Sequence, residues 1–156
     1  MLTAKPDAMT AAGDFRPPCS TDLLLPSDTA ETRRVQDQIA EQLAAHAVAE
    51  QDIFSIRLAL EEALVNAVKH GNQMDRSKKV RIRYRIQRDR FEAEVSDEGG
   101  GFDPSDVPDP TAVENLERPC GRGLMLMRYY MNQVEYNDRG NSVRMVKLFR
   151  TSPRTA

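Results

Sequence analysis

The sequence predicts an α+β fold, a two-layer sandwich in which helices cover one face of a mostly antiparallel sheet. One observation is the strict alternation of apolar and charged residues over 79–87, which is typical of a strand with one buried face. Another is that two long segments repeat apolar residues three and four positions apart, as amphipathic helices do. The third is the predicted order, strand-helix-helix-strand-strand-loop-helix-strand-strand, which suits this class.

The composition describes a soluble domain of ordinary size. The chain has 156 residues, 40% hydrophobic and 29% charged, with a formal net charge of -2. We therefore expect direct contact with neither nucleic acid nor membrane. Cys19 and Cys120 show neither disulfide nor metal-ligand spacing, so a reducing cytoplasm is the expected compartment. Residues 1–20 are predicted to be a flexible tail, 21–150 the domain, and 151–156 a C-terminal tail.

The domain is predicted to begin with a strand and a helix. TDLLLP (21–26) is interpreted as a short buried strand that its proline stops. Asp28 and Glu31 have the spacing of a capping box, although Ser27 could also cap the helix that begins here. This helix should run to about Val48. Its buried face is predicted to carry Val35, Ile39, Leu43 and Ala47.

A second helix is predicted from about Glu50 to Gly71. Gly71 should end it, because glycine readily adopts the left-handed conformation just past a helix end. The apolar stripe of this helix is predicted to carry Ile53, Ile56, Leu60, Ala63, Leu64 and Ala67.

The sheet is completed by four further predicted strands. The strand at 79–87 turns its apolar residues inward, and a short turn joins it to a strand at 91–97. Strands at 133–137 and 142–149 are predicted to form a hairpin that closes the sheet. The inward-facing residues of the first of these strands are Val80, Ile82, Tyr84 and Ile86. Its outward row, Arg81, Arg83 and Arg85, is interpreted as a solvated sheet face rather than a nucleic-acid patch.

The end of the second helix, EEALVNAVKHGN (61–72), carries polar residues at a spacing that suggests chemistry. Glu62 and Asn66 are four residues apart and therefore lie on one helical face, at the edge of the apolar stripe. A carboxylate and an amide oxygen there could hold a hydrated Mg²⁺ or orient an attacking hydroxyl. Alternatively, Asn66 bonds locally and Glu62 points to water, and the helix taken alone favours this second interpretation.

Two glycine-rich motifs change that balance. SDEGGGFD (96–103) places Asp97 at a strand end, followed by Gly99 and Gly101 in a D-x-G-x-G pattern. Such a carboxylate could accept a hydrogen bond from an exocyclic amino group like that of adenine, because glycines permit close approach of a ligand. GRGL (121–124) places a second glycine pair at a predicted helix start, where backbone N–H groups favour phosphate. The alternative for residues 96–103 is an ordinary glycine-rich turn, and the alternative for residues 121–124 is a flexible hinge.

The order of these motifs resembles that of a known ATP-binding family. A helix with E-x-x-x-N, a strand with D-x-G-x-G, a long loop and a G-x-G at a helix start are similar to the GHKL, or Bergerat, fold. Gyrase B subunits, the heat-shock chaperone of the 90-kDa class, histidine kinases and MutL proteins share this fold. The resemblance covers roughly residues 20–150, and ALEEALVNAVKHGN is particularly similar to stand-alone anti-sigma-factor serine/threonine kinases. It implies ATP and Mg²⁺ as ligands.

The resemblance also implies roles for the motif residues. Glu62 resembles the general base that activates a hydroxyl or water, and Asn66 resembles the Mg²⁺ ligand. Asp97 resembles the adenine-contacting residue, in a pocket shaped by Gly99 and Gly101. The phosphate-binding turn beneath the ATP lid is implied to contain Gly121 and Gly123.

Other residues near the motifs have less definite roles. Lys69, beside His70 at the helix end, could approach phosphate or simply favour a helix C-terminus. Arg118 and Arg122 could supply positive charge for the γ-phosphate, but ERPCGRG departs from the family pattern and their roles stay open. The loop from about Gly100 to Arg118 is expected to be a mobile lid. Glu61 is expected to be exposed. Met125, Leu126 and Tyr129 are expected to lie in the core.

The function implied by the resemblance is an ATP-dependent serine/threonine protein kinase that is also an anti-sigma factor. It would bind a sigma factor and phosphorylate a STAS-type anti-anti-sigma antagonist, as a cytoplasmic homodimer. Two alternatives stay open. One is a non-catalytic, ATP-dependent switch that grips a partner, although a pure binder needs no base at Glu62. The other is a detached histidine-kinase-like ATPase domain. The chain has no room for the phosphoacceptor domain of a histidine kinase, so a separate protein would have to provide it. The sequence does not identify the sigma factor, the antagonist or the stimulus.

Overall fold

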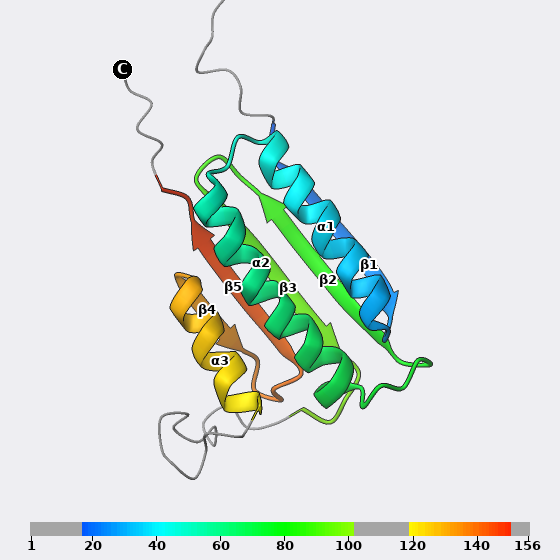
Figure 1. Ribbon diagram of the computed structural model, residues 1–156. Helices are drawn as coiled ribbons and strands as arrows, with labels where there is room; N and C mark the ends of the chain where they lie inside the picture. Colours follow the sequence, from blue (N-terminus) through cyan, green and yellow to red (C-terminus); the bar gives the residue numbers. More distant parts are fainter. Residues whose placement is uncertain (1–16, 102–118, 151–156) are drawn as a thin grey trace, which may run out of the picture.

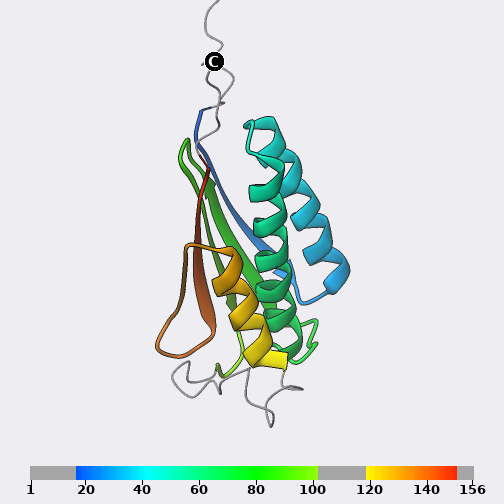
Figure 2. The ribbon, with the colours of Figure 1, turned by 60° about the vertical axis from the view of Figure 1, so that its left-hand side comes forward.

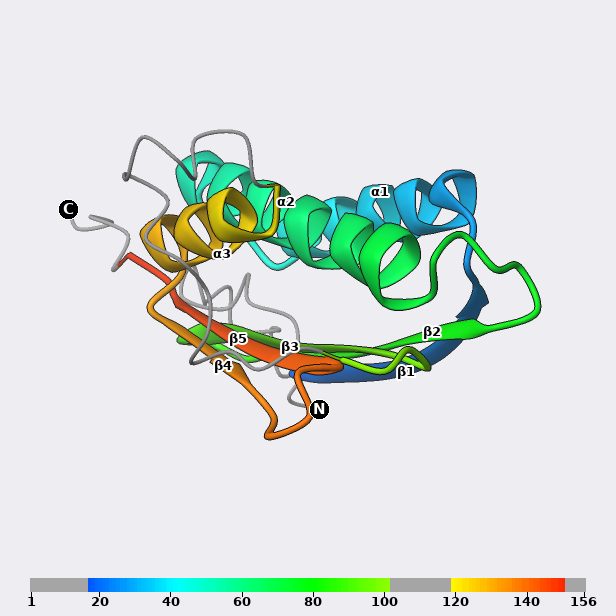
Figure 3. The same cartoon turned by 90° about the horizontal axis from the view of Figure 1, so that it is seen from below.

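A computed structural model of the chain describes residues 17–101 and 119–150. Within these ranges, five strands form one antiparallel sheet in the order β1-β2-β3-β5-β4, and the helices cover one face of it (Figure 1 and Figure 3). The strands are β1 (Cys19–Pro26), β2 (Lys79–Ile86), β3 (Arg90–Asp97), β4 (Gln133–Tyr136) and β5 (Ser142–Leu148). The helices are α1 (Thr29–Ala45), α2 (Glu50–Val65), its continuation as a π-helical turn η2 (Asn66–Gly71), and α3 (Pro119–Tyr130). The predicted fold class is confirmed, and the helices and strands of the described residues follow the predicted order.

The first strand differs from its prediction. β1 lies at an edge of the sheet and pairs only with β2, so it is half-buried rather than buried, and its Leu24 is 65% exposed. The strand begins at Cys19, two residues before the expected start of the domain. Pro26 ends it, which an edge position tolerates because proline donates no hydrogen bond to the ladder.

The first helix begins as predicted and ends earlier. Asp28 is its N-cap, and its side chain accepts a hydrogen bond from the Ala30 N–H at 2.8 Å. The helix ends at Ala45, and Ala47 takes a φ of 61° outside it. Ala47 is exposed, so the prediction that it continues the buried face is wrong. The other three residues predicted for that face are buried.

The second helix ends by a different mechanism from the predicted one. Its last turn widens, and the Asn72 N–H donates at 2.8 Å to the carbonyl of Ala67, five residues earlier. Gly71 does not have a positive φ; the left-handed residues are Gln73 and Met74, at φ 53° and 62°. Gly71 is therefore glycine for another reason, which lies in its contact with β3.

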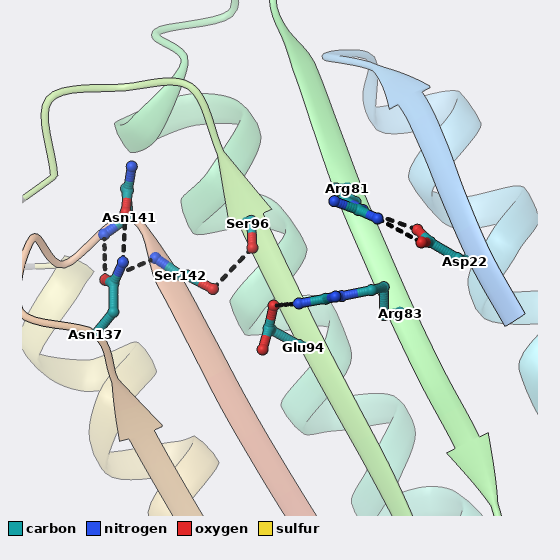
Figure 4. A network of polar contacts seen from close by, with 8 residues as sticks. All are labelled: Asp22, Arg81, Arg83, Glu94, Ser96, Asn137, Asn141 and Ser142. Carbon is teal, nitrogen blue, oxygen red and sulfur yellow. Dashed lines mark hydrogen bonds and ion pairs between the residues drawn. The ribbon is translucent and has the colours of Figure 1, made fainter. Parts of the chain in front are cut away.

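The core lies between the helices and the sheet. The apolar residues of β2 and β3 alternate into it as predicted, and Val80, Ile82 and Ile86 are completely buried. The opposite face carries ion pairs, including Arg81 with Asp22 and Arg83 with Glu94 (Figure 4). This agrees with the interpretation of the arginine row as a solvated sheet face.

Helix α3 starts earlier than predicted. It begins at Pro119, so Gly121 and Gly123 lie inside the helix instead of ahead of it. Its buried side is formed by Leu124 and Met127. Tyr129 is 79% exposed and Met125 is 43% exposed, so their assignment to the core is wrong, whereas Leu126 is half-buried. Leu124, Met127 and Met131 are buried at spacings of three and four, so the helix buries the face next to the predicted one.

Candidate nucleotide-binding site

The motif residues meet at one end of the domain. The C-terminal turns of α2 and η2, the end of β3 and the first turn of α3 all lie there (Figure 1 and Figure 2). A pocket of about 120 Å³ lies between η2 and the sheet at this end. It is lined by Ala63, Asn66, Ala67, His70, Gly71, Val95, Asp97, Gly101, Tyr136, Gly140, Asn141, Ser142 and Val143. The pocket is well above the roughly 10–15 Å³ that one water molecule needs.

A larger hollow of about 370 Å³ lies on the exposed sheet face. Its lining includes the charged side chains Asp22, Arg83 and Glu94, which are paired with neighbours on that face. None of the predicted motif residues line it, so its size alone does not make it the functional site.

Glu62 and Asn66 project from α2 and η2 toward α3. The backbone of Gly123 passes so close that a β-carbon there would lie 3.0 Å from Glu62 Oε2 and 3.1 Å from Asn66 Nδ2. Burial raises the pKa of the Glu62 carboxyl above its usual value, and the neighbouring Glu61 carboxylate raises it further. The first turns of α3 thus lie directly over a carboxylate and an amide.

Asp97, at the end of β3, is half-buried beside the pocket. Its carboxylate accepts a hydrogen bond from the Gly99 N–H at 2.8 Å, and its own N–H donates to the Asn141 carbonyl at 2.9 Å. Burial raises the pKa of Asp97, while the Gly99 bond and the charge of Lys78 oppose that rise. A partly desolvated acceptor of this kind suits a hydrogen-bond donor on a ligand, because hydrogen bonds strengthen at low dielectric.

Glycines surround Asp97 because the backbones meet closely there. A β-carbon on Gly71 would lie 2.3 Å from Asp97 Oδ2, and one on Gly99 would lie 1.9 Å from the Gly71 carbonyl oxygen. Gly101 has φ +78°, and a β-carbon there would lie 1.8 Å from the Arg139 carbonyl oxygen. The D-x-G-x-G motif is thus a junction between η2, the end of β3 and the β4–β5 turn.

Some predicted site residues are not brought to the pocket. Lys69 is exposed and does not line it, whereas the adjacent His70 does. Gly121 and Arg122 occupy the first turn of α3. Arg118 and the predicted lid after Gly101 lie outside the described residues, as do most of the two predicted tails.

Glu61 differs from its prediction as an exposed residue. Its side chain is half-buried, and Gln36 of α1 donates a hydrogen bond to Glu61 Oε2 at 2.6 Å. Gln36 is itself 6% exposed. The carboxylate next to Glu62 is therefore held in place by the neighbouring helix.

Sequence reasoning missed the contribution of the β4–β5 hairpin. The hairpin is predicted only to close the sheet, yet five of its residues line the pocket: Tyr136, Gly140, Asn141, Ser142 and Val143. It also missed Asn72, which is completely buried beside Asp97. The only local signal was an asparagine placed directly after the helix-ending glycine, and its partners are too distant in sequence for that signal to identify.

The described residues offer no group of three or more His, Cys, Asp and Glu side chains that could hold a metal ion. A divalent cation at Asn66 would therefore depend on oxygens from a ligand. Mg²⁺ suits this arrangement because it is commonly held by one or two protein oxygens together with phosphates and water.

The family comparison identifies the chain as an ATPase-type domain. The histidine kinase-like ATPase domain family matches residues 25–147, and the chain belongs to this family. The predicted membership in the GHKL group is thereby confirmed.

Individual relatives share part of the chain. It is similar to serine-protein kinase RsbW of Bacillus licheniformis, with 35% identity over 105 residues, which are 62% of this chain and 64% of the relative. Serine/threonine-protein kinase BtrW of Bordetella bronchiseptica is 30% identical over 88 residues, 55% of this chain and 62% of the relative. The chain thus spans less than two thirds of the length of these curated relatives.

A solved structure supports the same fold. The crystal structure of the RsbU and RsbW domains of a Mycobacterium tuberculosis protein superposes with a TM-score of 0.60. It is 19% identical and covers 90% of this chain and 35% of the other. Separately, none of the helices in the described part of this chain is long and apolar enough to cross a membrane.

Proposed function

We propose that the chain is an ATP-dependent serine/threonine protein kinase that also acts as an anti-sigma factor. The observation that carries this proposal is the position of Gly123, which brings α3 against Glu62 and Asn66 at the end of the domain where Asp97 lines a pocket. Glu62 supplies a general base, Asn66 supplies an amide oxygen, and Asp97 supplies a carboxylate that can recognise adenine. These groups suit phosphoryl transfer from ATP. The kinase names of the relatives support the same conclusion.

The adenine ring is proposed to enter the pocket beside Asp97. The ionised carboxylate of Asp97 accepts a hydrogen bond from the exocyclic amino group, while Ala63, Ala67 and Val95 provide the apolar walls. The Gly99 N–H already bonds to Oδ1 of this carboxylate, so Oδ2 is proposed as the acceptor for the amino group.

The phosphates are proposed to lie between Asn66 and the first turn of α3, near Gly121, Arg122 and Gly123. Asn66 would contribute an amide oxygen to hold a Mg²⁺ ion. Such an ion would supply positive charge that offsets the charge of the phosphates. Backbone N–H groups at the start of α3 favour phosphate for the same electrostatic reason.

Glu62 is proposed to be the general base. Its carboxylate takes the proton from a serine or threonine hydroxyl of the partner as that oxygen bonds to the γ-phosphorus. The bond from the γ-phosphorus to the bridging oxygen breaks, and ADP leaves with the electron pair. Burial raises the pKa of Glu62, which makes its carboxylate a stronger base.

The protein partners are proposed from the family resemblance. A sigma factor is bound directly, and a STAS-type anti-anti-sigma protein is both competitor and phosphoacceptor. The chain is proposed to act as a cytoplasmic homodimer, with the exposed sheet face or α1 as the contact. Light scattering at high micromolar concentration should give twice the chain mass, and a monomeric mass would contradict the dimer.

The decisive test is transfer of labelled γ-phosphate from ATP to a candidate STAS-type partner. We expect acid-stable phosphoserine or phosphothreonine on the partner with the wild type. An acid-labile phosphohistidine product would favour the histidine-kinase-like alternative. Binding of both ATP and the partner without any transfer would favour the non-catalytic switch.

A further inference from the structure

Asn72 follows the π-helical turn and is completely buried, and both ends of its side-chain amide are used. Nδ2 donates to the Lys79 carbonyl at 2.9 Å and to Ser27 Oγ at 2.6 Å. Oδ1 accepts from the Glu98 N–H at 2.8 Å. The orientation of the amide is determined by these partners, because a carbonyl only accepts and a backbone N–H only donates.

These bonds lie at the point where β2 and β3 separate. Val80 and Asp97 are the last directly paired residues there, and Lys79 and Glu98 are the next residues outward. The amide of Asn72 connects the Lys79 carbonyl to the Glu98 N–H, as a peptide group of an intervening strand would. The hydrogen-bonded ladder is thus continued past Asp97 by a side chain.

The consequence is that Asp97 is held from both sides. Its own N–H is bonded to the Asn141 carbonyl at 2.9 Å, and the next N–H along the chain, that of Glu98, is held by Asn72. The Glu98 peptide leads directly to Gly99, whose N–H donates to Asp97 Oδ1 at 2.8 Å. A shift of the Glu98 peptide away from Asn72 would therefore move the Gly99 N–H that bonds to the Asp97 carboxylate.

We propose that Asn72 is a positioning residue for nucleobase selection, which acts by holding the Asp97 carboxylate where it reads the amino group of adenine. This rests on the proposed function, in which Asp97 contacts adenine. Asn72 does not line the pocket, so it acts through Asp97 and not on the ligand.

The test compares the affinities for ATP and inosine triphosphate by calorimetry. Inosine carries an oxygen in place of the amino group, so the wild type should prefer ATP. Asn72→Ser leaves a side chain too short to connect Lys79 with Glu98. We expect it to reduce the preference for ATP by about tenfold, because a misplacement of about 1 Å at a reacting or reading group can cost up to 10²-fold.

The matched control is Ser27→Ala. It removes one buried partner of Asn72, yet leaves the bonds from Asn72 to Lys79 and Glu98 in place. It should lower the melting temperature without changing the preference for ATP. Asn72→Asp keeps the acceptor for the Glu98 N–H and loses the two donors, so it should retain more of the preference than Asn72→Ser. If Ser27→Ala and Asn72→Ser lose the preference for ATP equally, Asn72 has only a structural role and the proposal is wrong.

A double-mutant cycle and amide hydrogen exchange also test the proposal. In a double-mutant cycle, Asn72→Ser should cost little additional preference once Asp97 is replaced by Asn, since both act on one contact. In the wild type, the Glu98 amide should exchange with solvent as slowly as the central amides of β3. Fast exchange at Glu98, full additivity, or an unchanged preference in Asn72→Ser would overturn the proposal. A wild type that binds no nucleotide would instead refute the proposed function.

Discussion

Gly123 lies against Glu62, and a β-carbon on Gly123 would lie 3.0 Å from the Glu62 carboxylate oxygen Oε2. The same β-carbon would lie 3.1 Å from the amide nitrogen of Asn66. Glycine is a poor residue for a helix interior, where it costs about 1 kcal/mol relative to alanine. Its presence in α3 is explained by the space that the two side chains of α2 and η2 require.

We therefore expect Gly123→Ala to separate stability from activity. The substitution should leave the melting temperature unchanged or raise it, because alanine favours the helix. It should lower phosphoryl transfer by about tenfold, because both Glu62 and Asn66 must shift. Gly100→Ala is the control, since a β-carbon at position 100 meets no atom within 4 Å. A Gly123→Ala protein that is destabilised and fully active would contradict this account.

The role of Glu62 as a base predicts a specific pattern of losses. Glu62→Gln keeps the shape of the side chain and removes the proton acceptor. It should bind ATP as the wild type does and transfer phosphate about 10²–10⁴-fold more slowly. Glu61→Gln, one residue away, is the comparison and should retain most of the transfer rate. If Glu62→Gln phosphorylates the partner at the wild-type rate, the assignment of the base is wrong.

Asp97→Asn should weaken ATP binding. The carboxylate loses its ability to accept strongly from the adenine amino group, at a cost of about 1–3 kcal/mol, or roughly 5–150-fold in affinity. Glu98→Gln removes the neighbouring exposed carboxylate and should leave the affinity unchanged. Calorimetry showing the same ATP affinity in Asp97→Asn as in the wild type would remove Asp97 from the adenine site.

The stability of the ligand-free chain should depend on pH through the same two carboxyls. Burial raises the pKa of Asp97 above its usual 3.8 and that of Glu62 above its usual 4.5. At pH values just above 3.8 and 4.5, the folded chain therefore binds more protons than the unfolded chain. The stability that the two carboxyls contribute is lost as pH rises through their raised pKa values.

Replacing both carboxyls should therefore reduce this loss. The double variant Asp97→Asn, Glu62→Gln should gain stability relative to the wild type as pH rises above about 4, with the gain constant once both carboxyls are ionised. Urea midpoints between pH 4 and 8 measure the difference, and Asp138→Asn, which removes an exposed carboxylate, is the control. A difference that shrinks as pH rises would show that the sign is wrong.

Asp52 is predicted to stabilise the packing of the segment after β5 against α2. It is 1% exposed, its Oδ2 accepts the Arg150 N–H at 2.9 Å, and its Oδ1 has the Arg150 guanidinium at 3.6 Å. Asp52→Ala should lower the free energy of unfolding by about 1–3 kcal/mol, because the Arg150 N–H loses its hydrogen bond to a buried carboxylate. Arg150→Ala keeps that N–H and should cost less. Equal losses in the two variants would assign the effect to the side-chain ion pair.

Local patterns determined most of the fold. The alternation along β2 follows from the pleat of a strand with one buried face, and the helical stripes follow from the turn of the helix, so neither depends on distant residues. The cap at Asp28 is equally local, since its acceptor and donor are two residues apart. Glu62 and Asn66 could be paired from their spacing on one helical face. The sequence alone therefore determined the fold class and the pairing of Glu62 with Asn66.

The tertiary structure decided what those residues contact. Gly71 is glycine because the Asp97 carboxylate from another element approaches it, and Asn72 bonds to Glu98, 26 residues further along the chain. Gly123 became a neighbour of Glu62 only when α3 packed on α2. Such contacts depend on strand register and helix packing, which join segments distant in sequence. A local pattern carries no information about which backbone will approach, and this is why the pocket had to be found in the folded chain.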